Sequence, residues 1–150
     1  MKKLFAATAL ATAMVASPAA AQTFTYEVQF GEPDMIGGMG AEGRDGRSAI
    51  MSGPYTTSSA DGSKVSGTIR CVGMDQPDNG LFDAHLSCTA TRTDGSQSSL
   101  IYGCNSLGED RGFSCVGGME GKSGSLTGRR GVLTMHLRRG TSVGTGQFIE

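Results

Sequence analysis

The chain contains no tryptophan, only two histidines and only four prolines, and neither sign of charge is in excess. Its 13 basic and 14 acidic residues leave a net charge of −1, so bulk charge draws it neither to nucleic acid nor to an anionic membrane. Beyond residue 21 it also has no apolar run approaching the ~20 residues of a membrane-spanning helix. We therefore expect no nucleic-acid partner and no membrane span; the sequence does not specify an oligomeric state.

The motifs of common catalytic and metal sites are also missing. No C-x-x-C pair occurs, and Gly121-Lys-Ser-Gly-Ser125 misses the G-x-S-x-G nucleophile elbow by one position. Asp83, His85 and His136 are the residue types of a two-histidine, one-carboxylate metal site. The face that carries Asp83 and His85 also carries hydroxyl side chains, however, which is typical of a strand facing solvent. We therefore expect no catalytic residue, no metal and no organic cofactor.

The first 21 residues have the three parts of a secretory signal peptide. Met1-Lys2-Lys3 is positively charged, residues 4–15 are mostly apolar, and residues 18–21 (Pro-Ala-Ala-Ala) form a small-residue cleavage site. Residues 22–150 then form the mature protein, whose length suits one domain. This organisation predicts a periplasmic or extracellular location, where cysteines can oxidise.

After residue 22, apolar and polar residues alternate between turn signals, as half-buried strands require. Turn-forming pairs recur at Asp45-Gly46, Asp61-Gly62, Asn79-Gly80 and Asp94-Gly95. The pattern predicts an all-β domain of eight short antiparallel strands, near residues 23–30, 47–56, 64–72, 81–91, 97–104, 113–117, 131–139 and 144–149.

The four cysteines lie symmetrically about two turns. Cys71 and Cys88 are equidistant from Asn79-Gly80, the sequence of a two-residue type I′ hairpin. Cys104 and Cys115 are equidistant from Glu109-Asp110, within the loop at residues 108–112. In an antiparallel hairpin, residues equidistant from the turn lie opposite one another. This spacing pairs Cys71 with Cys88 and Cys104 with Cys115.

The loop between these two hairpins decides among the three connectivities that four cysteines allow. If residues 93–95 form a three-residue loop with its glycine in the left-handed region, Cys88 faces Leu100. Cys88 and Cys104 are then offset by four residues, on the order of 13 Å, which exceeds the ~7 Å Cα limit of a disulfide. The predicted disulfides are therefore 71–88 and 104–115.

Eight antiparallel strands with short connections form either a closed barrel or a sandwich of two sheets. Glycine favours the barrel, because closure needs tight bends and bulges. The chain has 24 glycines, several of them within predicted strands: Gly53, Gly67, Gly103, Gly128, Gly144 and Gly146. We therefore predict a single up-and-down β-barrel stabilised by two disulfides, with a β-sandwich as the alternative.

One glycine-rich stretch, residues 117–132, resembles a known superfamily. The spacing Gly124-x-Leu126-x-Gly128-x-x-Gly131, with Gly117-Gly118 upstream, is similar to the T-G-x-F-x-G-x-x-G signature of the barrel superfamily of allene oxide cyclases and plant dirigent proteins. The resemblance implies an eight-stranded barrel whose interior holds apolar small molecules without a metal or organic cofactor. We recognise no catalytic residue of those enzymes in this chain, so the resemblance implies a fold and not an activity.

The connection from Gly31 to Gly46 is longer than a hairpin loop and carries three apolar side chains among its glycines. We predict that it covers the barrel mouth, as a plug or as a lid over a ligand, or that it is a disordered loop. Two tyrosines have the parity that points into the barrel, where a polar group among apolar walls orients a ligand. The predicted ligand-binding residues are therefore Tyr26, Tyr102, Met35, Ile36 and Met39.

Three functions are compatible with such a barrel. The first is a non-enzymatic periplasmic or secreted protein that binds a small apolar molecule in its interior or a partner protein through its loops. The second is a cofactor-free isomerase or cyclase of the allene oxide cyclase type, which the resemblance suggests. The third is an inhibitor of an extracellular enzyme that acts through an exposed loop such as Asp75–Gly80.

Overall fold

The computed structural model describes residues 22–37, 47–77, 79–108 and 110–149, so the predicted signal peptide (1–21) lies outside the described residues. The described chain is all-β apart from one short 3-10 helix. Its elements are β1 (Thr23–Gln29), β2 (Asp34–Ile36), β3 (Ser48–Ser59), β4 (Lys64–Asp75), β5 (Ala84–Arg92), β6 (Gln97–Ser106), β7 (Phe113–Gly121), η1 (Gly124–Leu126), β8 (Arg130–Arg138) and β9 (Thr141–Ile149). Within this part of the chain, no helix is long and apolar enough to cross a bilayer.

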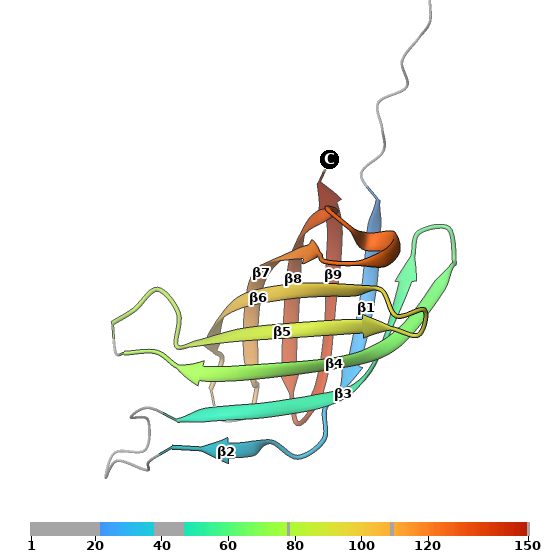
Figure 1. The fold of residues 1–150 in the computed structure, drawn as a ribbon. Coiled ribbons are helices and arrows are strands. Elements are labelled where there is room, and N and C mark those ends of the chain that lie inside the picture. The colour runs from blue at the N-terminus through green and yellow to red at the C-terminus, as the bar shows by residue number, and fades with distance from the viewer. Residues whose placement is uncertain (1–21, 38–46, 78, 109, 150) are drawn as a thin grey trace, which may run out of the picture.

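Eight of the strands close into a barrel (Figure 1). Strands β3 to β9 pair with their neighbours along the chain in antiparallel ladders, β9 pairs with β1, and β1 pairs with β3 to complete the ring. This order confirms the predicted up-and-down β-barrel over the alternative sandwich. Closure also satisfies the strand edges that an open sheet would expose.

Strand β3 is shared between two partners. Its C-terminal half pairs with β1 and its N-terminal end pairs with β2, the short ninth strand. Between them, the Gly31 amide donates to the Ser52 carbonyl at 3.0 Å, so β2 continues the line of β1 along β3. It lies at the end of the barrel opposite η1 (Figure 1). The alternation pattern did not predict β2, because three residues are too few to show a period.

Both predicted disulfides are present, and each joins directly opposed residues of a hairpin. Cys71 lies opposite Cys88, and Cys104 lies opposite Cys115. The register between the two hairpins is also as predicted, because Gly95 adopts a φ of 84° in its loop and places Leu100 opposite Cys88. All four cysteines are at most 4% exposed, so the bridges belong to the barrel core.

The turn between β4 and β5 differs from the prediction although its register does not. A type I′ turn at Asn79-Gly80 needs a positive φ at both residues. Asn79 has a φ of 68°, but Gly80 does not have a positive φ. The ladder instead ends where the Gln76 amide donates to the Asp83 carbonyl at 2.8 Å. The hairpin tip is a longer loop centred on the same point, and the cysteine pairing is therefore unchanged.

The core fills the barrel interior with side chains that alternate with solvent-facing ones along each strand. It consists of Val28, Ile69, Cys71, Leu86, Cys88, Ala90, Leu100, Tyr102, Cys104, Cys115, Leu133 and Met135. Strand β7 extends to Gly121, beyond the predicted end at residue 117, because its two central glycines stay in register with β6.

Four interior glycines make room for aromatic rings of the strand beside them. In each case a side chain on the glycine would overlap the ring opposite: the pairs are Gly67 with Tyr55, Gly117 with Tyr102, Gly144 with Tyr26 and Gly146 with Phe24. These strand glycines therefore serve ring packing as well as curvature. Gly128 is different, since it lies in the turn after η1 with a φ of 74°.

Candidate functional site

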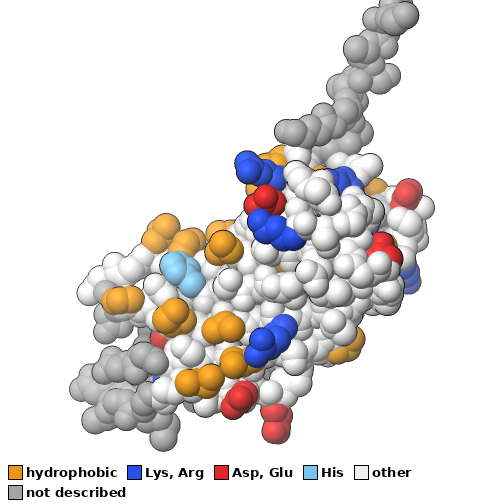
Figure 2. Space-filling view, in the orientation of Figure 1, with side chains coloured by type: hydrophobic (Ala, Val, Ile, Leu, Met, Phe, Trp, Pro, Cys, Tyr) orange, Lys and Arg blue, Asp and Glu red, His pale blue; other side chains and the backbone are white. Residues whose placement is uncertain are grey.

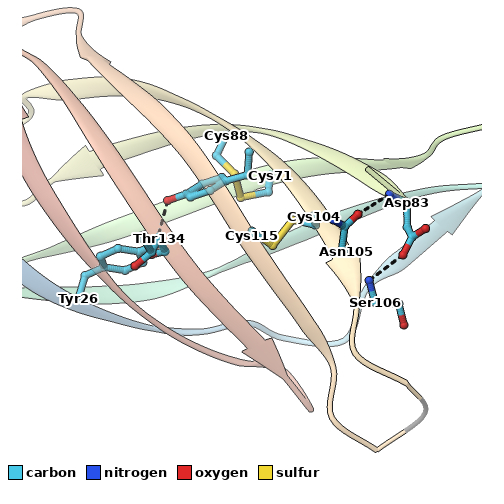
Figure 3. Close-up of a disulfide and its surroundings, with 10 residues drawn as sticks. Tyr26, Cys71, Asp83, Cys88, Cys104, Asn105, Ser106, Cys115 and Thr134 are labelled. Carbon is cyan, nitrogen blue, oxygen red and sulfur yellow. Dashed lines mark hydrogen bonds between the residues drawn. A yellow bond between two sulfur atoms is a disulfide. The ribbon is translucent and has the colours of Figure 1, made fainter. Parts of the chain in front are cut away.

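Two spaces lined by the described residues lie at opposite ends of the barrel interior. On β4, Gly73 lines the space at the β2 end and Ile69 lines the space at the η1 end. Cys71 lies between them, and its partner Cys88 occupies the corresponding position on β5. Figure 3 shows both disulfides, together with Tyr26 and Thr134. The disulfide layer therefore separates two potential binding sites.

Tyr26 and Tyr102 meet in this layer. The Tyr26 hydroxyl donates to the Thr134 carbonyl at 2.7 Å and lies 3.1 Å from the Tyr102 hydroxyl. Because Tyr26 has one hydroxyl proton, Tyr102 is the donor between the two phenols. Burial raises the pKa of Tyr26 to about 12, although the hydrogen bond from Tyr102 opposes the shift, and burial also raises the pKa of Tyr102. Both phenols therefore stay protonated at neutral pH.

The space at the η1 end, here called the closed cavity, is small. Its volume is about 80 Å³, which is less than the roughly 150 Å³ cavity that holds benzene in another protein. Leu126 of η1 lines it and is 2% exposed. Both predicted tyrosines line this cavity. An apolar ligand of drug-like size, which needs roughly 300 Å³ or more, does not fit there.

The space at the β2 end, here called the mouth, is larger and is lined by β2 and by the paired strand ends at Phe113 of β7 and Leu137 of β8. Its volume is about 220 Å³. Most of its lining is apolar: Pro33, Met35, Ala49, Met51, Ala84, Leu86, Phe113 and Leu137 contribute to it. At its rim, Arg47 Nε lies 3.1 Å from an Asp75 carboxylate oxygen.

Of the three apolar residues predicted to cover the mouth, the structure describes two, Met35 and Ile36. Met35 lines the mouth from β2, opposite Ala49 of β3. Ile36, the next residue, does not line it. Both side chains are more than half exposed. Met39 lies outside the described residues.

The residue types of a metal site do not come together in the described part of the chain. No group of three or more histidine, cysteine, aspartate or glutamate side chains is positioned there to hold a metal ion. His136 Nε2 lies 2.8 Å from the Arg111 carbonyl oxygen, and the His85 ring contacts Phe82 edge-on. An Asp83 carboxylate oxygen accepts a hydrogen bond from the Ser106 amide at 2.8 Å (Figure 3). These three side chains therefore stabilise loops and strand ends.

The outer wall carries an apolar surface that the sequence did not predict. Val72, Ile101 and Val132 occupy solvent-facing positions of one row across β4, β6 and β8, and each is at least 42% exposed. A groove runs beside this row, over the glycines of β6 and β7. Figure 2 shows hydrophobic side chains gathered on the visible face around a histidine. The signal was present in the sequence as apolar residues at both parities of these strands.

Comparisons with known proteins bear on the fold. No family model matches the chain, and no curated protein matches it. A solved structure of a protein with unknown function from Clostridium acetobutylicum ATCC 824 matches with a TM-score of 0.54 and 14% identity. The match covers 85% of this chain and 95% of the other. The likeness shows a shared fold and assigns no activity.

Proposed function

We propose that this protein is a non-enzymatic barrel that binds a small apolar molecule in its mouth. The observation that supports this proposal is the contrast between the two interior spaces. The mouth has about 220 Å³ and mostly apolar walls, whereas the closed cavity has about 80 Å³. The mouth exceeds the roughly 150 Å³ that accommodates one benzene ring and is below the usual range for drug-sized ligands. A ligand of one or two fused rings, or of similar size, fits this volume.

The lining favours binding over chemistry. Met35 and Met51 come from two neighbouring strands, and methionine side chains adapt to apolar ligands of different shape. The ionisable groups of the mouth within the described residues are Arg47 and Asp75, which form an ion pair with each other. The mouth therefore offers apolar contacts and a charged rim.

Titration with indole tests the proposal, with amide chemical shifts as the measurement. We expect saturable shifts at mouth residues such as Met35 and Leu86. Mass spectrometry of the natively purified protein should in addition show a co-purified apolar molecule.

Ala84→Leu and Thr89→Leu form a matched pair of variants for this titration. Ala84 lines the mouth, and Thr89 lies on the solvent-facing side of the same strand. Filling the mouth with Ala84→Leu should weaken indole binding at least tenfold, while Thr89→Leu should leave it unchanged. Indole binding that is equal in the two folded variants, or absent from the mouth of the unmodified protein, would contradict the proposal.

A further inference from the structure

We propose that the closed cavity is a second, chemically different site, which binds a small carboxylate anion of the size of formate or acetate through the Arg92 guanidinium and the Ser98 hydroxyl. This site lies at the η1 end of the barrel, beyond the disulfide layer from the mouth. It is independent of the proposed apolar ligand, because the two cavities share no lining residue.

Arg92 provides the positive charge. It lies at the end of β5 with the parity that points inward, and it lines the cavity. Opposite it stands Gly67, whose missing side chain leaves room for the Tyr55 ring, and the Arg92 charge opposes the rise in the pKa of Tyr55 that burial causes. Within the described residues, no carboxylate lies within ion-pair distance of this guanidinium. The nearby carboxylate of Asp94 instead accepts the Ser96 amide at 2.8 Å.

Ser98 provides a free hydroxyl. It is 4% exposed and lines the cavity from β6, and its hydroxyl makes no hydrogen bond to the described residues. The Ser98 side chain has the same inward parity as Leu100 and Tyr102, so its hydroxyl is available to donate a proton to an anion in the cavity. Ser59, from the end of β3, adds a second hydroxyl to the lining without a side-chain hydrogen bond of its own.

The remaining walls select the kind of anion. Leu100, Met119 and Leu126 are apolar, so the cavity suits a carboxylate that carries at most a small hydrocarbon group, such as the methyl group of acetate. A planar carboxylate matches the fork of a guanidinium. The volume of about 80 Å³ corresponds to roughly two or three waters at ~30 Å³ each, which limits the ligand to a few atoms.

A second guanidinium adds to the positive potential at this end of the barrel. The Arg129 side chain stacks on the outer side of the end, with its Cζ atom 3.7 Å from the centre of the Phe148 ring, and Phe148 lines the cavity. Glu120, an acidic residue of the same end, is paired with Lys122 at 2.9 Å. Arg92 and Arg129 therefore bring two positive charges to this end of the barrel, against the Asp94 carboxylate that lies near Arg92.

The test is a titration of the full protein with sodium acetate, followed by amide chemical shifts, against sodium chloride at equal ionic strength. We expect saturable acetate-dependent shifts at Tyr55, Ser98 and Leu100, with a dissociation constant on the order of 1 mM or weaker for so small a ligand. Chloride should not reproduce these shifts. Shifts that stay linear in acetate concentration, or that chloride reproduces, would overturn the proposal.

Two matched pairs of variants locate the binding. Arg92→Met should weaken acetate binding roughly 10- to 100-fold, as loss of a charged hydrogen bond does, while Arg130→Met removes the same charge from the solvent-facing side of β8 and should have little effect. Ser98→Val, which fills the cavity and keeps the charge, should abolish binding, while Ser99→Val on the opposite face of β6 should not. If Arg92→Met does not fold, the comparison of Ser98→Val with Ser99→Val tests the site alone. Equal effects within either folded pair would refute the site.

Discussion

The Tyr102 hydroxyl donates to the Tyr26 hydroxyl 3.1 Å away, and the Tyr26 hydroxyl in turn donates to the Thr134 carbonyl at 2.7 Å. This relay starts on β6 and reaches β8 through β1, so it crosses the barrel between strands that are not neighbours. Each phenol proton is engaged in the relay. Removal of either proton breaks it.

We expect the barrel to lose stability as the pH rises from about 10 to 12. The pKa of Tyr26 is raised from 10.0 to about 12, and the pKa values of Tyr55 and Tyr102 are raised too, with burial as the main cause in all three. In that window the unfolded tyrosines have lost protons that the folded ones retain. The free energy of unfolding should therefore fall with rising pH by up to about 1.4 kcal/mol per pH unit for each of Tyr26 and Tyr102, and by less for Tyr55, which is only half-buried.

Absorbance at 295 nm measures this effect directly, because it reports tyrosinate. The folded protein should titrate above pH 10, and the same protein in urea should titrate near pH 10. Coincident titrations in the two states would contradict the raised pKa values. Urea unfolding at fixed pH values between 8 and 11.5 then measures how steeply the free energy of unfolding falls with pH.

The direction of the relay predicts unequal effects of removing its two hydroxyls. Tyr26→Phe leaves the Tyr102 hydroxyl buried without an acceptor, and should cost about 1–3 kcal/mol. Tyr102→Phe leaves the bond from Tyr26 to Thr134 intact, and should cost less, about 0.5–1.5 kcal/mol. Tyr102 is the more buried of the two, so burial alone predicts the opposite order. Urea unfolding of both variants at pH 7 distinguishes the two explanations.

Ser142→Ala should stabilise the protein. Ser142 is 0% exposed, and its hydroxyl has no hydrogen-bond partner among the described residues. Removing an unsatisfied buried hydroxyl should raise the free energy of unfolding by about 1 kcal/mol. Ser96→Ala is the control, since the Ser96 hydroxyl is also in a buried residue but accepts the Ser125 amide at 3.2 Å. The control should destabilise; two variants that shift the melting temperature in the same direction would contradict this account.

The packing of rings on glycines predicts a rescue. A side chain at Gly146 would overlap atoms of the Phe24 ring, whereas one at Gly117 would also overlap the Ile101 carbonyl. Gly146→Ala should cost about 1–3 kcal/mol as an overpacked core does, and Phe24→Leu should recover part of this loss in the double variant. Gly117→Ala should destabilise the protein more than Gly146→Ala. A smaller side chain at Tyr102 should not restore stability, because the overlap with the Ile101 carbonyl would remain. Additive effects of the two changes at 24 and 146 would rule out the proposed contact.

The strand register was predictable from the sequence because several local signals agreed. The symmetry of Cys71 and Cys88, the parity of Leu100 and the left-handed glycine at position 95 all require one alignment of β4, β5 and β6. The 76–83 loop was not predictable in detail, since any loop centred on the same point gives the same pairs.

The candidate sites were less predictable than the register. Parity placed Tyr26 and Tyr102 in the interior, yet their contact crosses the barrel and depends on how far the strands are staggered when the sheet closes. Met35 was predicted to cover the mouth, and the structure places it in the lining. Arg92 and Ser98 gave no signal of their own, because a charged or hydroxyl residue near a strand end is ordinary in sequence and notable only when it faces a cavity.

The pairing of β1 with β9 also has a consequence for the order in which the strands are expected to fold. Gln29 and Thr141 hydrogen-bond through their side chains although they lie 112 residues apart, whereas every ladder from β3 to β9 joins strands that are consecutive in the chain. The local hairpins are therefore expected to form first, and ring closure by β1 is expected to be the slow step. Until then the edges of β1, β3 and β9 are open to pairing with another chain. Because β1 lies near the start of the described chain and β9 near its end, the ring cannot close until nearly all of this part of the chain is in place.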